Sequence, residues 1–150
     1  MDAFEKISRL VARRDYSTKQ IKEKLIRAGF SLPETDAAIA RAKECGYIDD
    51  MRFTRMYVFS KFNQGQGILR IKQQLKTLGI EGEFIDAFYA DASSSSGLDE
   101  YERALRFLEL HPTQSKNIRD ASFRKLVNKG FSIDVCSKAA RSYAENHAYT

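Results

Sequence analysis

The sequence has few residues that interrupt or cross-link a chain. It contains two prolines and eight glycines in 150 residues, and most of the glycines stand at the ends of apolar-patterned segments. Proline is strongly unfavourable inside helices, so a chain this poor in proline can form long helical stretches. Apolar residues recur at helical spacing throughout, which favours an all-α protein.

Cysteine is scarce as well. Cys45 and Cys136 stand far apart, and neither has a second Cys or a His at the spacing of a metal site. This favours free thiols in a reducing compartment. The sequence shows no charged-then-apolar leader and no apolar run long enough to cross a membrane. We therefore expect a cytoplasmic protein that holds no metal and has no membrane association.

Groups suited to catalysis are few. His111 and His147 are the only histidines, and no nucleophile stands in a recognisable turn motif. The run Gly65-Gln66-Gly67 matches the start of a dinucleotide-binding fingerprint. It lacks the third Gly and the preceding strand, so a helix-breaking joint is favoured over a phosphate cradle. The sequence predicts a protein that is not an enzyme and needs no cofactor.

What the sequence does contain is a segment that recurs at residues 16–30, 66–80 and 117–131. In each copy a basic helical stretch places a Leu four residues before a Gly, and a large apolar residue follows the Gly. Such a repeat predicts similar units stacked in a row, each with a small core of its own. Stacked units usually make an extended binding surface and not a single pocket.

The repeat divides the chain into three units. We place the first three-helix repeat at 1–48, the second at 49–92 and the third at 98–150, with a flexible Ser-rich linker at 93–97. The sequence thus predicts an all-α fold of nine helices, arranged as three tandem three-helix repeats in an elongated, curved molecule.

Local signals predict where the helices begin and end. Ser17 with Gln20 predicts a capping box at the second helix, and Asp49 predicts the cap of the fourth. Gly29, Gly79 and Gly130 are expected to end the repeat helices; like the cap at Asp49, these roles are structural.

Apolar spacing predicts the buried faces. Ile21, Leu25 and Ala28 are expected to face the first core. In the third repeat the apolar stripe is expected to rotate toward Phe123, Leu126 and Val127. The fourth helix is apolar on nearly all sides, so we expect it in the middle of the molecule, in contact with both neighbouring units.

Charge is unevenly distributed along the chain. The formal net charge is +5, and basic residues gather at 6–27, 51–80 and 116–129, the second of these without any acidic residue. This alternation favours basic patches repeated along the molecule, facing nucleic acid or an acidic protein groove. Solvated helix faces remain the alternative for any one cluster.

Three motifs resemble signatures of the RecX family. The first is carried by Arg13-Arg14-Asp15-Tyr16-Ser17, Lys24-Leu25 and Gly29-Phe30. The second is Gly46-Tyr47-Ile48-Asp49-Asp50-Met51-Arg52-Phe53. The third is carried by Gly65, Gly67, Arg70-Ile71, Leu75 and Gly79-Ile80. Gln64, Gln66, Ile68 and Leu69 stand where the family usually has Pro and basic residues, so this loop offers less charge than the family pattern.

The resemblance implies a modulator of the RecA recombinase. Such a protein lies in or caps the RecA–DNA filament and lowers its ATPase, strand-exchange and coprotease activities. The expected partners are the RecA filament and, weakly, single- and double-stranded DNA, and the expected state is a monomer. The candidate RecA- and DNA-binding residues are Arg13, Arg14, Lys22, Lys24, Arg27, Arg52, Arg55, Arg70, Lys72, Lys76, Arg124, Lys125 and Lys129.

Two other functions fit the same residues. A stand-alone DNA-binding module would use the basic helices on phosphates and would bind naked DNA with a steep salt dependence. A purely structural helical adaptor would respond neither to salt nor to RecA.

Overall fold

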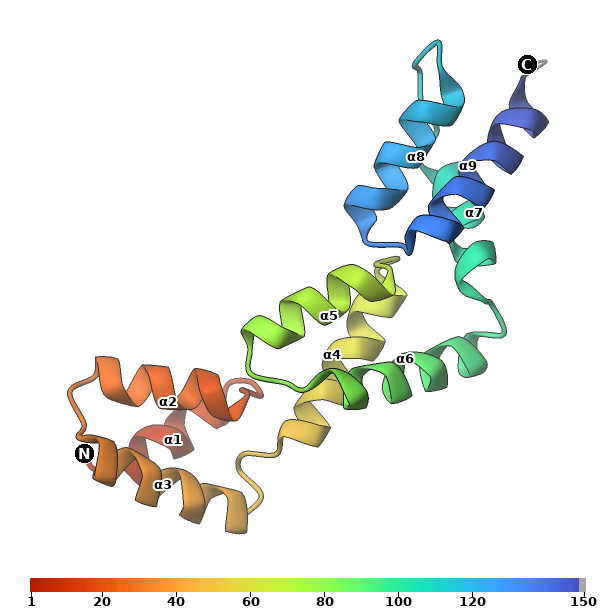
Figure 1. Ribbon diagram of the computed structural model, residues 1–150. Coiled ribbons are helices and arrows are strands. Elements are labelled where there is room, and N and C mark those ends of the chain that lie inside the picture. Colours follow the sequence, from red (N-terminus) through yellow and green to blue (C-terminus); the bar gives the residue numbers. More distant parts are fainter. Residues whose placement is uncertain (149–150) are drawn as a thin grey trace.

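The computed structural model describes residues 1–148, which form nine helices and no strand. The helices are α1 (Ala3–Val11), α2 (Thr18–Arg27), α3 (Leu32–Glu44), α4 (Asp50–Asn63), α5 (Ile68–Thr77), α6 (Gly82–Ser96), α7 (Glu100–Leu110), α8 (Ile118–Lys129) and α9 (Ile133–His147). Figure 1 shows them as three groups of three that follow one another along an elongated, bent molecule. The prediction of an all-α repeat fold is confirmed.

Each group of three helices encloses a separate core. Ile21 and Leu25 lie in the core of α1–α3, and Ile71 and Leu75 lie in that of α4–α6. Leu126 lies in the core of α7–α9. We call these groups the first, second and third units. Because each unit buries its own apolar residues, the units meet one another only at two joints.

The recurring Leu-x-x-x-Gly-apolar segment is a helix-ending motif. The N–H of Phe30 donates to the carbonyl of Leu25, and the N–H of Ile80 donates to that of Leu75, at 3.2 and 3.1 Å. Phe131 repeats this bond in the third unit. The Gly between them has a positive φ each time, as a Schellman motif requires. The repeat therefore encodes the same stop after α2, α5 and α8.

Side-chain caps start the helices where the sequence predicts them. Ser17 and Gln20 form a reciprocal capping box on α2. Asp49 accepts a hydrogen bond from the N–H of Arg52 at the start of α4. Each cap satisfies a backbone donor that the first turn leaves unpaired, which fixes the helix start.

The Ser-rich segment is helical, which corrects the expected flexible linker at 93–97. Helix α6 runs to Ser96 and ends at Gly97 in the left-handed conformation. Ala92 is buried and holds this part of the helix against the protein. The hydroxyl of Ser93 donates to the carbonyl of Leu98 at 2.9 Å, so the serines bond to the helix end instead of loosening it. The remaining repeat boundaries stay predictions.

Two expected burial patterns are each wrong at one residue. Ala28 is the C-cap of α2 and is exposed, because the helix ends before that position turns inward. In α8 Leu126 is buried and Phe123 packs against the core as expected, but Val127 is 39% exposed and Ser122 is buried one turn before Leu126. The buried side of α8 is set by the four-residue spacing from Leu126, so position 122 is buried even though its residue is polar.

Helix α4 is also less buried than expected. Its buried residues are Phe53, Thr54, Val58 and Phe62, which follow one side of the helix. Met56 lies on another side and is 56% exposed. The helix carries apolar residues on nearly all sides, but only one side is buried.

Candidate binding surface

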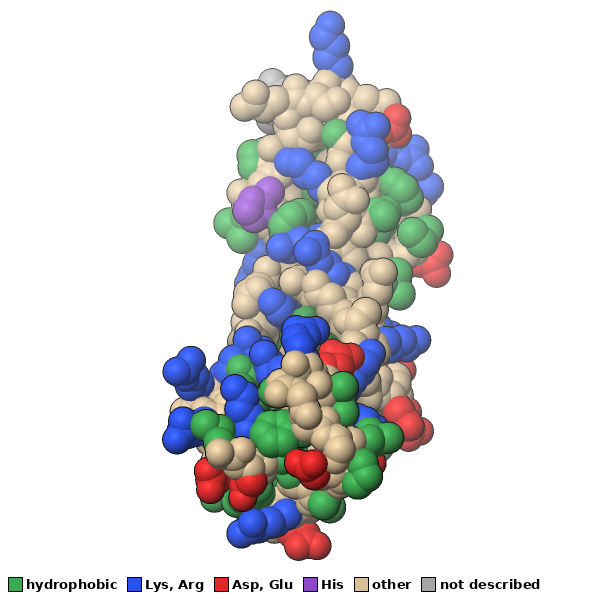
Figure 2. Space-filling model, turned by 90° about the vertical axis from the view of Figure 1, so that its left-hand side faces the viewer, with side chains coloured by type: hydrophobic (Ala, Val, Ile, Leu, Met, Phe, Trp, Pro, Cys, Tyr) green, Lys and Arg blue, Asp and Glu red, His purple; other side chains and the backbone are tan. Residues whose placement is uncertain are grey.

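The three repeat helices line one side of the molecule. In Figure 1, α2, α5 and α8 lie along the upper-left, inner side of the bend. Figure 2 views the molecule from that left side and shows Lys and Arg spread from the first unit to the third, with Asp and Glu gathered toward the lower end and the right edge. We call this side of the molecule the basic face.

In the first unit, aromatic and cationic side chains lie together at the joint of α1 and α2. The guanidinium of Arg14 lies 4.7 Å from the ring centre of Tyr16, and the ammonium of Lys24 lies 5.4 Å from it. A cation over an aromatic ring is attracted by the negative ring face. Tyr16 thus holds two of the candidate residues near the surface and orients them.

Lys22 and Lys72 make the same ion pair in successive units. Lys22 Nζ lies 3.7 Å from a carboxylate oxygen of Asp36, and Lys72 Nζ lies 2.7 Å from one of Asp86. Both pairs tie the second helix of a unit to its third. The third unit has Phe123 at this place and makes no such pair there. The equal fourteen-residue spacing of Lys and Asp in the two units was a usable sequence signal for this contact.

Candidate residues of the second unit are partly engaged in the fold. Arg52 donates to the carbonyl of Gly46 at 3.1 Å and lies 3.5 Å from the carboxylate of Asp15. The guanidinium of Arg55 lies 5.6 Å from the ring centre of Phe59. These contacts leave the side chains at the surface, but they fix where the charges stand.

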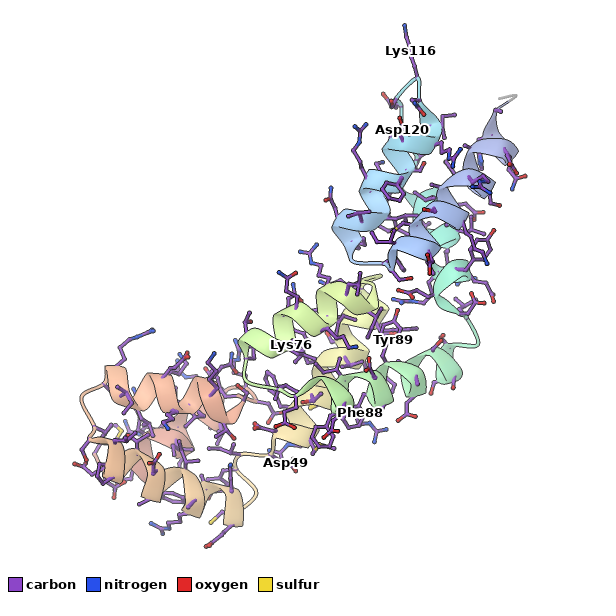
Figure 3. The ribbon with its side chains drawn as sticks, in the orientation of Figure 1. Asp49, Lys76, Phe88, Tyr89, Lys116 and Asp120 are labelled. Carbon is purple, nitrogen blue, oxygen red and sulfur yellow. The ribbon has the colours of Figure 1, made fainter. Side chains whose placement is uncertain are left out.

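In the third unit two of three candidates are engaged. Lys125 Nζ donates to the carbonyls of His111 and Pro112 at 2.9 and 3.2 Å, which holds the turn before α8. Lys129 lies 5.4 Å from the ring centre of Phe107. In Figure 3 this turn lies at the tip of the molecule, where Lys116 extends away from it.

Four candidates are exposed and make no ion pair, side-chain hydrogen bond or ring contact with the rest of residues 1–148. They are Arg13, Arg27, Lys76 and Arg124. Arg27 stands two residues after the buried Leu25, and Arg124 stands two residues before the buried Leu126, so both point away from their cores at 100° per residue. No contact within the fold has to break for these cations to pair with another molecule.

Sequence reasoning missed Arg103, the one buried arginine of the described chain. It is 7% exposed and stacks over the ring of Phe62 with 3.5 Å between the guanidinium carbon and the ring centre. One of its terminal nitrogens donates to the carbonyls of Phe62 and Gln66 at 2.7 and 2.9 Å, and the other donates to the hydroxyl of Tyr89 at 2.6 Å. Arg103 thus fastens α7 to the second unit.

Burial shifts the pKa values of this cluster. It raises the pKa of Tyr89 to about 12, against the opposing effect of the neighbouring Arg103 charge. It also lowers the pKa of Arg103, which the phenolic group and Glu100 oppose. Nothing around Arg103 in the sequence signals burial, because its neighbours on α7 include Glu100 and Glu102. Only the tertiary arrangement of Phe62 and Tyr89 makes this a place for a guanidinium.

The Gly-x-Gly segment joins the second unit to the third. The N–H of Gly67 donates to the carbonyl of Lys129, and the N–H of Leu69 donates to that of Gly130, both at 2.9 Å. A Cβ on Gly67 would come within 2.4 Å of the backbone of Gly130. The prediction of a helix-breaking joint is confirmed here, because α4 ends and α5 begins on either side of it. Gln66 is buried in this joint instead of facing a ligand.

Within residues 1–148, no group of three or more His, Cys, Asp or Glu side chains could hold a metal ion. None of the helices in that range combines the length and the apolar character needed to cross a membrane.

Fold and surface together define a class of protein: a tandem array of three-helix units with basic side chains along one face. The family models agree in detail. The model described as the first three-helix domain of RecX matches residues 3–41, and that of the second matches residues 49–87. The chain belongs to the RecX family.

Individual relatives extend the similarity along the chain. The regulatory protein RecX of Legionella pneumophila is 29% identical over 149 residues, which are 97% of each chain. The regulatory protein RecX of Haemophilus influenzae (strain PittEE) is 29% identical over 138 residues, or 88% of each chain. That of Acidithiobacillus ferrooxidans is 38% identical over 73 residues, about half of each chain.

Solved structures share the fold. The crystal structure of RecX from Lactobacillus salivarius superimposes with a TM-score of 0.74 over 95% of both chains, at 18% identity. A second crystal structure, of a regulatory protein RecX, gives a TM-score of 0.70 at 20% identity and covers 89% of this chain and 67% of that one. The arrangement of helices is thus that of solved RecX proteins.

Proposed function

We propose that this protein is a negative regulator of the RecA recombinase. It binds the RecA–DNA filament through its basic face and inhibits ATPase, strand exchange and coprotease activity by blocking filament extension or promoting disassembly. It acts as a monomer in the cytoplasm, without a cofactor and without chemistry of its own. Family membership supports the general part of this proposal, a regulatory role, because the relatives are named regulatory proteins.

The observation that carries the proposal best is the placement of cations along three equivalent helices. Arg27 on α2, Lys76 on α5 and Arg124 on α8 are exposed at successive units of the bent array. A filament of repeating subunits and phosphates offers acidic groups at regular intervals. An array of units fits such a partner because each unit can meet one interval.

The cations that already make contacts within the protein have a different role in this proposal. Lys22 and Lys72 hold their units together, and Arg70 donates to the carbonyl of Asn128 at 3.1 Å across the second joint. We assign these three residues mainly to the shape of the basic face. The four candidates without intramolecular contacts, Arg13, Arg27, Lys76 and Arg124, are assigned to the partner.

A stand-alone DNA-binding module is the second candidate function. The observation in its favour is that the same four cations could each meet a phosphate. Such a module would bind naked DNA tightly, and its affinity would fall steeply with salt. Four such contacts spread over three units predict weak intrinsic DNA affinity, which is why RecA regulation is preferred.

The test is the single-stranded-DNA-dependent ATPase rate of RecA from the same organism, titrated with this protein. A fall in the rate at well below one molecule per RecA supports regulation of the filament. A fall only when the protein coats the DNA contradicts it and favours the DNA-binding module. Binding of the protein to the same DNA without RecA, measured by fluorescence anisotropy, separates the two in one set of conditions.

A further inference from the structure

We propose that the second and third units move as one rigid body, and that the first unit swings against them at a hinge closed by exposed charged contacts. This inference concerns the shape of the molecule and goes beyond RecA regulation. It comes from a difference between the two joints. The second joint is made of buried and backbone groups, whereas the first is made mainly of exposed charged side chains, with one part-buried hydrogen bond from the N–H of Thr18 to Asp50.

The joint between the second and third units is stiff. Two backbone hydrogen bonds connect Gly67 and Leu69 to the end of α8, with no side chain between the two backbones at Gly67. Arg103 adds three hydrogen bonds from a buried position on α7. Buried polar groups cannot exchange these partners for water, so separating the units would leave several of them unpaired.

The joint between the first and second units uses charged side chains at the surface. Lys19 Nζ donates to the carbonyl of Thr77 at 3.0 Å from an exposed position. Arg52 lies 3.5 Å from Asp15, with side chains 42% and 34% exposed. Water can replace each of these contacts when the joint opens, and salt screens the exposed ion pair.

The pivot is short and lies in the chain between α3 and α4. Ile48 is buried in the first core, and Phe53 is buried in the second. Between them Asp50 accepts a hydrogen bond from the N–H of Thr18 at 2.8 Å, which links the start of α4 to the start of α2. In Figure 3, Asp49 marks the start of α4 between the two units. Rotation about these few residues moves the first unit while both cores stay intact.

One hinge contact involves a candidate residue of the sequence. Arg52 lies in the first turn of α4, and it closes the hinge through Asp15. An anionic group that takes over Arg52 competes with Asp15 and so weakens the closed arrangement. An anionic partner therefore shifts the hinge in the same direction as salt does.

The experiment measures distances between pairs of nitroxide labels by double electron–electron resonance in the full chain. Cys45 is exposed and is replaced (Cys45→Ser), whereas Cys136 is buried and is retained. One pair, Ala37→Cys with Gln73→Cys, spans the first joint. The other pair, Gln73→Cys with Glu145→Cys, spans the second. All three positions are exposed and lie on helices.

Raising NaCl from about 0.1 M to about 1 M shortens the Debye length from about 10 Å to about 3 Å. We expect the distance distribution across the first joint to widen about two-fold while that across the second stays unchanged. In the variant Lys19→Met with Arg52→Met, the first distribution should already be wide at low salt. Lys43→Met with Arg9→Met, which removes two exposed cations elsewhere in the first unit, is the matched control and should leave it narrow.

Arg103→Met should widen the distribution across the second joint at both salt concentrations and leave the first unchanged. If this variant unfolds, the salt comparison on the labelled wild-type pairs decides alone. The hinge is refuted if the first-joint distribution stays narrow at about 1 M NaCl and in the Lys19→Met, Arg52→Met variant. It is equally refuted if salt widens both distributions to the same extent.

Discussion

The backbone N–H of Gly67 donates a 2.9 Å hydrogen bond to the carbonyl of Lys129, so the start of α5 and the end of α8 are joined without any side chain between them. The nearest backbone atoms of Gly130 would lie 2.4 Å from a Cβ at position 67. Real Cβ contacts are longer, so any other residue must push the two units apart.

We therefore expect Gly67→Ala to lower the free energy of unfolding by about 1–3 kcal/mol, the usual cost of overpacking a close contact. Urea unfolding followed by circular dichroism measures this. Gly82→Ala is the matched control, because a Cβ there meets only the end of Lys76 at 3.7 Å. It should leave stability unchanged or raise it by up to about 1 kcal/mol. Equal effects of the two substitutions would contradict the close contact at Gly67.

Replacing Arg103 by Met removes the donor for three acceptors at the second joint. The carbonyls of Phe62 and Gln66 and the hydroxyl of Tyr89 then lose their bond to it. We expect the free energy of unfolding to fall by about 2–4 kcal/mol, because buried polar groups are left without this partner. Arg106→Met, on the exposed side of the same helix, should change it by less than about 0.5 kcal/mol. A small effect at Arg103 would show that water replaces its bonds.

Ser122→Ala should stabilise the protein. The hydroxyl of Ser122 is fully buried and has no hydrogen-bond partner among the described residues. Its loss removes a desolvated polar group and adds helix propensity, which together should raise the free energy of unfolding by about 1–1.5 kcal/mol. Ser94→Ala, exposed on α6, reports the propensity gain alone at about 0.5 kcal/mol. A Ser122→Ala protein less stable than wild type would mean that the hydroxyl bonds to ordered water.

Cys136 should be unreactive while the protein is folded. Burial raises the pKa of its thiol from 9.0 to about 11, and the thiol donates to the carbonyl of Phe131 at 3.4 Å. At about pH 8, iodoacetamide should alkylate the exposed Cys45 and reach Cys136 only after unfolding. Mass spectrometry of the labelled peptides measures both rates, with Cys45 as the internal control.

The same shift predicts an alkaline loss of stability. Because the folded-state pKa of Cys136 is raised, its contribution is fully present below about pH 9 and is lost as the pH rises through about 11. The free energy of unfolding should fall over this window in the wild type and fall less in Cys136→Ala. Parallel curves for the two proteins would contradict a raised thiol pKa.

Removing three charges from the basic face should weaken partner binding without changing the fold. The variant Arg27→Gln, Lys76→Gln, Arg124→Gln loses cations that make no contact within residues 1–148. We expect an inhibition curve shifted to higher protein concentration in the RecA ATPase assay. The log–log salt slope of single-stranded DNA binding should fall by about 2, since each phosphate contact contributes about 0.7.

The matched control removes three cations from other positions. Lys43→Gln, Lys138→Gln, Arg141→Gln changes the net charge by the same amount, and all three side chains are exposed. It should retain inhibition and the salt slope. If both triple variants lose inhibition equally, net charge decides binding and the basic face has no special role.

Features that depend on neighbouring residues in the chain were predictable from the sequence. The stops at Gly29, Gly79 and Gly130 and the caps at Ser17 and Asp49 use donors and acceptors within six residues of one another. The repeat also predicted three separate cores, because the same local unit occurs three times. Local hydrogen bonding and apolar spacing are enough for these features.

Features of the joints were not predictable, because their partners lie far apart in the sequence. Arg103 bonds to groups 14, 37 and 41 residues away, and no local pattern distinguishes it from an exposed arginine. The serine-rich composition at the end of α6 suggested a flexible linker. The segment is helical instead, and the buried Ala92 anchors it. The sequence predicted which cations could form the candidate surface. It did not predict which of them make contacts within the fold.

The two joints also share one kind of contact. At each joint a basic side chain in the first turn of one repeat helix, Lys19 or Arg70, donates to a last-turn carbonyl of the next unit. The carboxyl end of a helix carries the negative end of the helix dipole, which favours a nearby cation. Helices α5 and α8 therefore each offer their dipole to the unit before them, and the same electrostatic contact recurs along the array.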